Sequence, residues 1–248
     1  PQQLYRYFKQ RFAQVTNPAI DPLRERLVMS LETVIGPRGS ILEQDASAAS
    51  VLKFTSPILD AQQFAWLKQQ DHLKVCSLDA RFPASEGEAS LEPALEALCD
   101  EAAAKVADGC GLLILSDRNI DQDYAPIPML LATAAVHHRL LRDGKRTRTA
   151  LVIESGEPRE DHHFACLIGY GAALVYPYLA YESAVDVLNN PKLETELSLE
   201  QAQTNYRKAI EKGILKIMSK MGISTISSYR GAQIFEAVGV AQSVIDRY

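Results

Sequence analysis

Four short apolar runs constrain this chain more than any other feature of its sequence. They are rich in β-branched or large apolar side chains and lie at residues 74–78, 112–116, 150–154 and 173–178. Runs that are apolar at almost every position are typical of strands buried on both faces of a parallel sheet. Long segments with helical periodicity separate most of them, which is the pattern of βα units. We therefore expect an α/β fold built from parallel βα units.

Two of the intervening segments carry matching helix signals. Apolar side chains repeat along one face of the first, at Leu91, Leu95, Leu98, Ala102 and Val106, and of the second, at Ile127, Leu130, Leu131, Ala134, His138 and Leu141. Ser90 is in position to be the N-cap of the first helix. An Asp-Gly pair follows each stripe, at 108–109 and 143–144, and glycine favours the end of a helix. The chain thus uses the same stop signal twice.

Further elements are expected towards the carboxyl terminus. A third helix should run from about Pro158, a good first-turn residue, to Ile168. Ser198 and Gln201 have capping-box spacing at the start of a long helix that ends near Met221 and Gly222. Residues 223–227 are a candidate fifth strand and residues 232–238 a last helix. A complete (β/α)8 barrel needs eight strands and five are indicated here. We expect a partial or degenerate TIM-barrel-like domain, and whether its sheet closes stays open.

The first 40 residues differ from the rest. Their aromatic side chains are followed by Thr16-Asn17-Pro18 and Asp21-Pro22, which disfavour a continuous helix. We expect an amino-terminal arm at 1–40 and an α/β core at 41–248, together forming a single domain at 1–248. The first residue is Pro1 and the last three are Asp-Arg-Tyr, so either end is a candidate cut through a longer protein.

Composition narrows the classes of partner. The net charge is -5, with 26 basic and 31 acidic residues spread along the chain, which gives no basic footprint for nucleic acid. The densest basic run, Lys145-Arg146-Thr147-Arg148, follows a turn and is expected to be a solvated loop. No apolar stretch approaches the roughly 18 to 20 residues of a membrane span, and the amino terminus is unlike a secretory signal. These features favour a cytoplasmic protein without nucleic-acid or membrane partners.

The cysteines and histidines are the candidate metal ligands of the sequence. Cys76, Cys99, Cys110 and Cys166 show neither a C-x-x-C motif nor regular spacing, so buried free thiols are expected. His162 and Cys166 are four residues apart and share one helix face, which supplies two of the four ligands of a structural zinc. No partner motif accompanies them. In the pair His137-His138, a core role is favoured over a catalytic base.

Two other patterns are candidates for binding or catalytic sites. Gly169-Tyr170-Gly171 follows a helix, whereas a phosphate cradle places its glycines between a strand and the start of a helix. A helix stop is therefore the better interpretation. Polar side chains follow the strands in a better position, because loops at the carboxyl ends of parallel strands form active sites. These side chains are Asp79, Asp117, Arg118 and Glu154. Acidic residues also cap helices there, so the functional alternative stays open.

Longer stretches carry a resemblance to a known family. They are FKQRFAQVTNPAIDPLRERLVMSLETVIGP (8–37), LDARFPA (78–84), LLILSDR (112–118), APIPMLLATAAVHHRLLRDG (125–144), LVIESGEPREDHHFACLIGYGAALVYPYLA (151–180) and ILKIMSKMGISTISSYRGAQIFEAVG (214–239). Together they cover nearly the whole chain, and the chain resembles the central domain of glutamate synthase. That enzyme makes glutamate from glutamine and 2-oxoglutarate.

The resemblance implies a role inside a larger enzyme. In the family, an amidotransferase domain with a catalytic amino-terminal cysteine hydrolyses glutamine. Ammonia then passes through an internal tunnel to a flavin domain that uses FMN and an iron-sulfur cluster. Here Pro1 is no nucleophile and the clustered cysteines are absent. The resemblance thus implies a noncatalytic connecting domain that has no cofactor or metal of its own and is related in fold to the FMN domain. The partners it implies are the amidotransferase and FMN domains of the same polypeptide, and for the parent enzyme a ferredoxin or NAD(P)H electron donor.

Two sets of residues are candidates for that role. The resemblance places the segment Gln14, Val15, Thr16, Asn17 and Pro18 near the ammonia route. Such a segment offers backbone carbonyls and small polar groups without a charge, although a rigid connector is the simpler interpretation. His162 and Cys166, on the helix face opposite Phe164 and Ile168, are candidate interdomain contacts. The alternative function is a stand-alone barrel enzyme that uses the strand-end residues.

Overall fold

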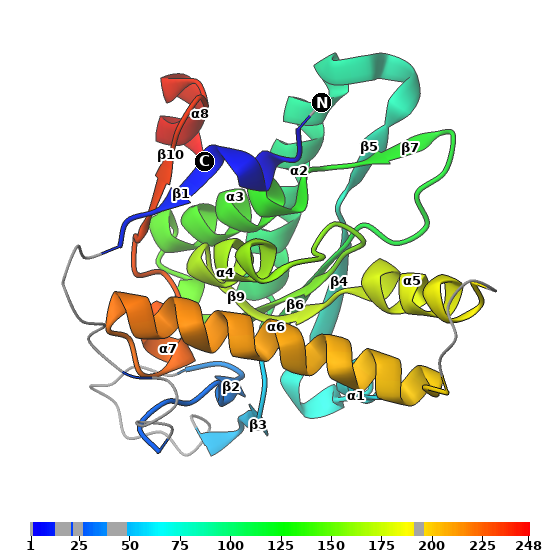
Figure 1. The fold of residues 1–248 in the computed structure, drawn as a ribbon. Helices are drawn as coiled ribbons and strands as arrows, with labels where there is room; N and C mark the ends of the chain where they lie inside the picture. The colour runs from blue at the N-terminus through cyan, green and yellow to red at the C-terminus, as the bar shows by residue number, and fades with distance from the viewer. Residues whose placement is uncertain (1, 13–20, 22–26, 39–48, 191–195) are drawn as a thin grey trace.

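A parallel four-stranded sheet forms the centre of the molecule (Figure 1). The computed structural model describes residues 2–12, 21, 27–38, 49–190 and 196–248. The strands are β4 (Val75–Asp79), β6 (Leu112–Ser116), β8 (Ala150–Glu154) and β9 (Ala172–Tyr176), and they lie side by side in that order. The α/β class and the parallel βα units are therefore confirmed. Four sequential parallel strands make half the number in a complete barrel.

Three helices connect these strands in turn. They are α2 (Leu91–Ala107), α3 (Met129–Arg142) and α4 (Asp161–Gly169). A long helix, α6 (Leu199–Met221), packs against α4 and crosses the front of the view in Figure 1. Because α2 also packs on α3, these helices form one layer that covers one face of the sheet.

Each strand contributes apolar side chains to two separate cores. On β6, Leu113 and Leu115 join the core shared with α2, α3, α4 and α6, whereas Leu112 and Ile114 join a smaller core on the other face. All four of these side chains are fully buried. This alternation follows from the two-residue period of a strand, and it explains why the apolar runs are continuous.

The second face is covered by the amino-terminal part of the same chain. Strands β2 (Thr33–Ile35) and β3 (Leu52–Phe54) form an antiparallel pair, and α1 (Ala61–Leu67) follows them. Their apolar side chains complete the smaller core. Ile58 pairs with Val175 in a parallel bridge, so the segment between β3 and α1 also borders the sheet beside β9.

Two further antiparallel pairs lie outside the central sheet. β5 (Arg81–Pro83) pairs with β7 (Tyr124–Pro126), and β1 (Phe8–Gln10) pairs with β10 (Phe235–Ala237). The second pair joins the two ends of the chain, which lie beside each other in Figure 1 as the blue and red segments. The described part of the expected amino-terminal arm is thus folded onto the rest of the chain.

The remaining elements are short, apart from one helix. They are η1 (Leu4–Tyr7), η3 (Asp71–Leu73), η4 (Ala84–Ser90), η5 (Arg146–Arg148), α5 (Tyr178–Leu188), α7 (Ile226–Tyr229) and α8 (Gln242–Arg247). Among the described residues, no helix combines the length and the apolar character needed to cross a membrane.

Most of the predicted helix ends are confirmed. Ser198 accepts a hydrogen bond from the Gln201 backbone N–H, and the Gln201 side chain accepts one from the Ser198 N–H, so α6 begins with the expected capping box. Gly222 ends α6 in the left-handed conformation, with φ of 70°. Gly109 and Gly144 also have positive φ just after α2 and α3, which accounts for the repeated Asp-Gly stop.

Several local predictions are wrong. Ser90 does not cap α2, because its hydroxyl donates to the carbonyls of Pro83 and Gly87. Helix α4 begins at Asp161 rather than near Pro158. Residues 223–227 are no regular strand, since α7 begins at Ile226. The predicted helix at 232–238 contains strand β10, because pairing with β1 overrides the local pattern.

The basic run is also not simply a solvated loop. Arg146 is half-buried and donates hydrogen bonds to the His137 ring and to the carbonyls of Thr149 and Gly171, whereas Arg148 is exposed. The four cysteines are free, as expected; three are buried and Cys76 is half-buried.

Candidate functional site

The carboxyl ends of β6 and β8 bring several polar side chains together. Ser116 donates to the Glu154 carboxylate at 2.6 Å, and Ser155 donates to Asp117 at 2.5 Å. The Gly156 N–H also donates to Asp117, at 3.1 Å. We call these five residues, with Glu157, the carboxyl-end cluster. The parallel register places Ser116 opposite Glu154, so the sheet itself positions the cluster.

Asp117, like Ser155 in the same cluster, has no exposed surface. Burial raises the pKa of its carboxyl group, while the hydrogen bonds from Ser155 and Gly156 oppose that rise. The structure thus uses the carboxylate as an acceptor that fixes the loop after β8. A group held this way is a positioning group rather than a free base.

Arg118 and Asp79 also have partners within the chain. The Arg118 guanidinium lies 4.2 Å from the centre of the Tyr178 ring and donates to Glu182 at 2.9 Å. Asp79 accepts two hydrogen bonds of 2.7 Å from Arg81, one to each carboxylate oxygen. All four strand-end residues predicted from the sequence are therefore engaged by other residues of this chain.

Glu157 is a residue of interest that the sequence reasoning missed. Its carboxylate accepts a hydrogen bond of 3.1 Å from the Met129 N–H at the start of α3. Burial, and then the nearby Asp117 charge, raises the pKa of Glu157 to about 7. Its position, three residues beyond the strand-end Glu154, is the only sequence signal that points to it. A carboxyl group with such a pKa can exchange a proton near neutral pH.

His162 and Cys166 lie together, on one face of α4, as their spacing predicts. The His162 Nε2 atom is 3.0 Å from the Tyr5 carbonyl oxygen and 3.6 Å from the Cys166 Sγ atom. Cys166 is fully buried, and burial raises the pKa of its thiol. This face contacts the chain's own η1 segment. The half-buried His162 is therefore open to a direct contact with another domain, whereas Cys166 has no exposed surface.

The neighbouring His163 has a structural setting. Its ring stacks on Tyr5 with centroids 4.4 Å apart, and its Nδ1 atom accepts a hydrogen bond from the Arg159 N–H. Burial lowers its pKa, so the neutral ring is favoured. Within the described parts of the chain, no group of three or more His, Cys, Asp or Glu side chains is arranged to hold a metal ion.

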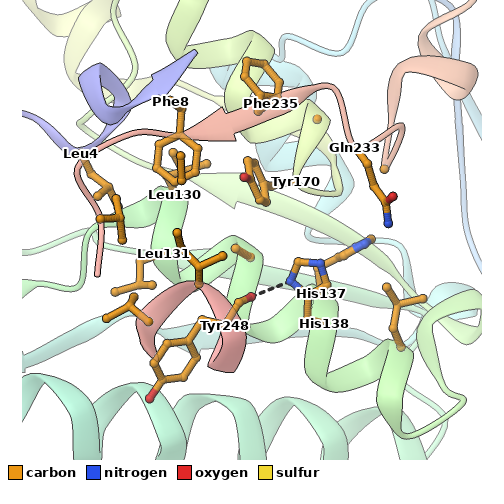
Figure 2. Close-up of a pocket in the computed structure, with 18 residues that line it drawn as sticks. Leu4, Phe8, Leu130, Leu131, His137, His138, Tyr170, Gln233, Phe235 and Tyr248 are labelled. Carbon is orange, nitrogen blue, oxygen red and sulfur yellow. Dashed lines mark hydrogen bonds between the residues drawn. The ribbon is translucent and has the colours of Figure 1, made fainter. Parts of the chain in front are cut away.

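A largely apolar pocket of about 360 Å³ lies between α3, the β1–β10 pair and α8 (Figure 2). Its labelled lining residues are Leu4, Phe8, Leu130, Leu131, His137, His138, Tyr170, Gln233, Phe235 and Tyr248. His138 Nδ1 is 2.5 Å from the Tyr248 carbonyl oxygen, the contact drawn dashed in Figure 2. The lining suits apolar groups.

His137 borders this pocket and is held neutral. Its Nδ1 atom accepts a hydrogen bond of 2.9 Å from Arg146, and burial followed by the Arg146 charge lowers its pKa to about 3. An imidazole with that pKa does not serve as a general base near neutral pH. Like His138, His137 is half-buried rather than part of the core, and its hydrogen bond with Arg146 gives it a structural role.

The Gly169-Tyr170-Gly171 motif ends α4, as expected. Gly171 has φ of 112°, and a Cβ atom there would lie 2.2 Å from the His137 ring. A Cβ at Gly169 would lie 2.5 Å from Phe235. These glycines therefore allow close packing at the pocket. The candidate tunnel segment, Gln14 to Pro18, lies outside the described residues.

Comparison with known proteins gives a consistent result. Residues 1–241 match the family described as the glutamate synthase central domain. The chain is 47% identical over its full length to a glutamate synthase [NADH] of Schizosaccharomyces pombe, and 47% identical over its full length to the glutamate synthase [NADPH] large chain of Bacillus subtilis. It is 48% identical over 99% of its length to ferredoxin-dependent glutamate synthase 1 of Arabidopsis thaliana. It spans only 12%, 16% and 16% of these relatives, respectively.

A likeness to a solved structure is weaker. The recombinant flavin-binding domain of baker's yeast flavocytochrome b2 aligns with 80% of this chain and 45% of its own, with a TM-score of 0.46 and 16% identity. The α/β class rests on the sheet and helices described above.

Proposed function

This chain belongs to the glutamate synthase central domain family, and we propose that it is the noncatalytic connecting domain of a glutamate synthase. In this proposal it couples an amidotransferase domain to an FMN domain of the same polypeptide and contributes to the passage of ammonia between them. FMN, the iron-sulfur cluster and the contact with an electron donor belong to other parts of that cytoplasmic enzyme.

The observation that carries the proposal is the engagement of the strand-end side chains. In barrel enzymes, this end of the sheet holds catalytic groups that face a substrate. Here Asp117 accepts from Ser155 and Gly156, Glu154 accepts from Ser116, and Asp79 is paired with Arg81. These contacts support a scaffold role for the carboxyl end, which is what we expect of a connecting domain.

One observation favours the alternative of a site at the strand carboxyl ends. Glu157, with a pKa of about 7, lies near Asp117, and two carboxyl groups in different environments are a recurring device for acid-base chemistry. The Met129 N–H already engages Glu157, and Glu157 does not line the apolar pocket described above. We therefore keep the connecting domain as the proposed function.

The coupling role is tested in the intact enzyme with a substitution in the candidate tunnel segment. Thr16→Trp adds a bulky side chain where small, uncharged groups are expected to let neutral ammonia pass. We expect glutamine hydrolysis to continue while less glutamate forms, so that the ratio of glutamine consumed to glutamate made rises above that of the unsubstituted enzyme. Thr16→Ser is the matched control and should leave the ratio unchanged.

The same assay tests the candidate interdomain contacts. His162→Ala removes the contact of a half-buried side chain with the Tyr5 carbonyl, and Cys166→Ala removes a fully buried thiol. We expect His162→Ala to alter the ratio and Cys166→Ala to alter it less. If Thr16→Trp leaves the ratio unchanged, the tunnel assignment is wrong; if His162→Ala leaves it unchanged, the contact assignment is wrong.

A further inference from the structure

A second cavity, of about 270 Å³, lies at the opposite end of the sheet from the carboxyl-end cluster. It adjoins Ala150, the first residue of β8. Three arginines line it: Arg38 after β2, Arg146 in η5 and Arg230 after α7. We call it the arginine pocket. Its other lining residues are Val34, Gly36, His137, Thr147, Thr149, Ala150 and Ser227.

The described lining of this pocket contains no carboxylate to balance the arginines. Arg146 directs its N–H groups to neutral acceptors, namely the His137 ring and two backbone carbonyls. Burial, then the charges of Arg230 and Arg38, lowers the pKa of Arg146 to about 10. A guanidinium with that pKa is still protonated at neutral pH, so the positive charges remain in the pocket wall.

Arg230 adds unsatisfied donors to this charge. Its Nε and Nη2 atoms are buried and have no hydrogen-bond partner among the described residues. Arg118 and Arg207 also each have one such buried nitrogen, but both pair elsewhere with a carboxylate, Glu182 and Asp60 respectively. Arg230 forms no ion pair within the described part of the chain. A buried, unpaired charge is costly, so a partner of opposite charge is expected.

The same protein shows what such a pair of nitrogens binds. In Arg81, the Nε and Nη2 atoms each donate a 2.7 Å hydrogen bond to one oxygen of the Asp79 carboxylate. The Nε and Nη2 donors lie on one edge of the planar guanidinium, and this edge matches two oxygens of a carboxylate or a phosphate. In Arg230, these are the two donors without a partner.

We propose that the arginine pocket binds an oxyanion, a carboxylate or phosphate group, with Arg230 as the bidentate donor and Arg146 and Arg38 supplying the surrounding positive charge. The hydroxyl groups of Thr147 and Ser227 line the same pocket and can donate to further oxygens. Two sources have this chemistry: a free anion, and a carboxylate side chain of the polypeptide to which this chain belongs.

The test uses the intact protein, prepared without phosphate or sulfate. Inorganic phosphate is titrated at constant ionic strength by calorimetry, and the pocket is inspected in a high-resolution structure with and without phosphate. The variant is Arg230→Gln, which removes the charged fork. Arg148→Gln is the matched control, because Arg148 is an exposed arginine of the same basic run and does not line the pocket.

For a free anion, we expect saturable phosphate binding that weakens at least about tenfold in Arg230→Gln and not in Arg148→Gln, since charged bidentate hydrogen bonds are among the strongest. Arg230→Lys, which keeps the charge but loses the fork, should restore binding only in part. For a side-chain source, the structure should show a carboxylate against Arg230 and no phosphate binding. The proposal is overturned if the structure shows no oxyanion at Arg230 and the two glutamine variants bind phosphate alike.

Discussion

The two ends of the central sheet hold buried charges in opposite ways. At the carboxyl end, the acidic side chains accept hydrogen bonds from neighbouring residues: Asp117 from Ser155 and Gly156, and Glu154 from Ser116. At the amino end, Arg146 and Arg230 lie near one another with no described carboxylate between them. The first arrangement stabilises this chain by itself, whereas the second needs a partner of negative charge. The carboxyl end, where barrel enzymes have their active sites, is thus the end whose charged side chains find their partners within this chain.

The largest expected effect comes from breaking the carboxyl-end cluster. Asp117→Ala would leave the Ser155 hydroxyl and the Gly156 N–H buried without an acceptor. We expect the free energy of unfolding of the 248-residue chain to fall by about 3 kcal/mol, since each unsatisfied buried group costs about 1 to 3 kcal/mol. Urea unfolding measures this. Asp186→Ala, at an exposed position of α5, is the control and should change stability little.

Asp117→Asn sharpens the same test. The asparagine side-chain oxygen can still accept from Gly156, but its amide cannot accept from Ser155. Its loss of stability should therefore be smaller than that of Asp117→Ala. Equal stability of Asp117→Ala and the unsubstituted chain would contradict the structural role of this carboxylate.

Urea unfolding at a series of pH values distinguishes the two ends of the sheet, because the pKa values of their titrating groups are shifted in opposite directions. Glu157, at the carboxyl end, has a folded pKa of about 7, raised from an ordinary value of 4.5. Because the pKa is raised in the folded state, Glu157 contributes fully to the free energy of unfolding below pH 4.5, and this contribution is lost as the pH rises through 7. The loss amounts to about 3 kcal/mol. Glu157→Gln should remove this part of the pH dependence, whereas Glu88→Gln, at an exposed position, should not.

At the amino end, the free energy of unfolding depends on pH in the opposite direction. His137 has a folded pKa of about 3, lowered from 6.5, so its contribution is complete above pH 6.5 and is lost as pH falls towards 3. At pH 5 the loss is about 2 kcal/mol. His137→Asn keeps an acceptor for Arg146 without titrating, and should flatten the acid limb of the same urea series. A variant that steepens that limb would contradict the neutral state of His137.

The sequence predicted the sheet well because its strands are buried on both faces. Residues 112–116 and 150–154 have the bounds that their apolar runs indicate, and β4 and β9 begin within one residue of the prediction. A continuous apolar run is a local signal, and the repeated Asp-Gly stops fixed the helix ends beside it. The capping box at Ser198 was predictable for the same reason.

Features that depend on distant partners were missed. The local pattern at residues 232–238 predicts a helix rather than β10, because the pairing of β10 with β1, more than 220 residues away, has no local signal. The basic run at 145–148 predicts a solvated loop, although Arg146 turns towards His137 and Gly171. Arg38 and Arg230 join Arg146 from separate parts of the chain, so no spacing in the sequence indicates the arginine pocket.

We propose that the carboxyl end of the sheet is scaffold in this domain rather than a flavin or substrate site. The most direct measurement is the visible absorption spectrum of the purified 248-residue chain during titration with FMN. We predict a spectrum that equals the sum of the protein and free FMN, both for the unsubstituted chain and for Asp117→Asn. Saturable perturbation of the flavin bands that Asp117→Asn abolishes would contradict the claim and bring the barrel-enzyme alternative forward.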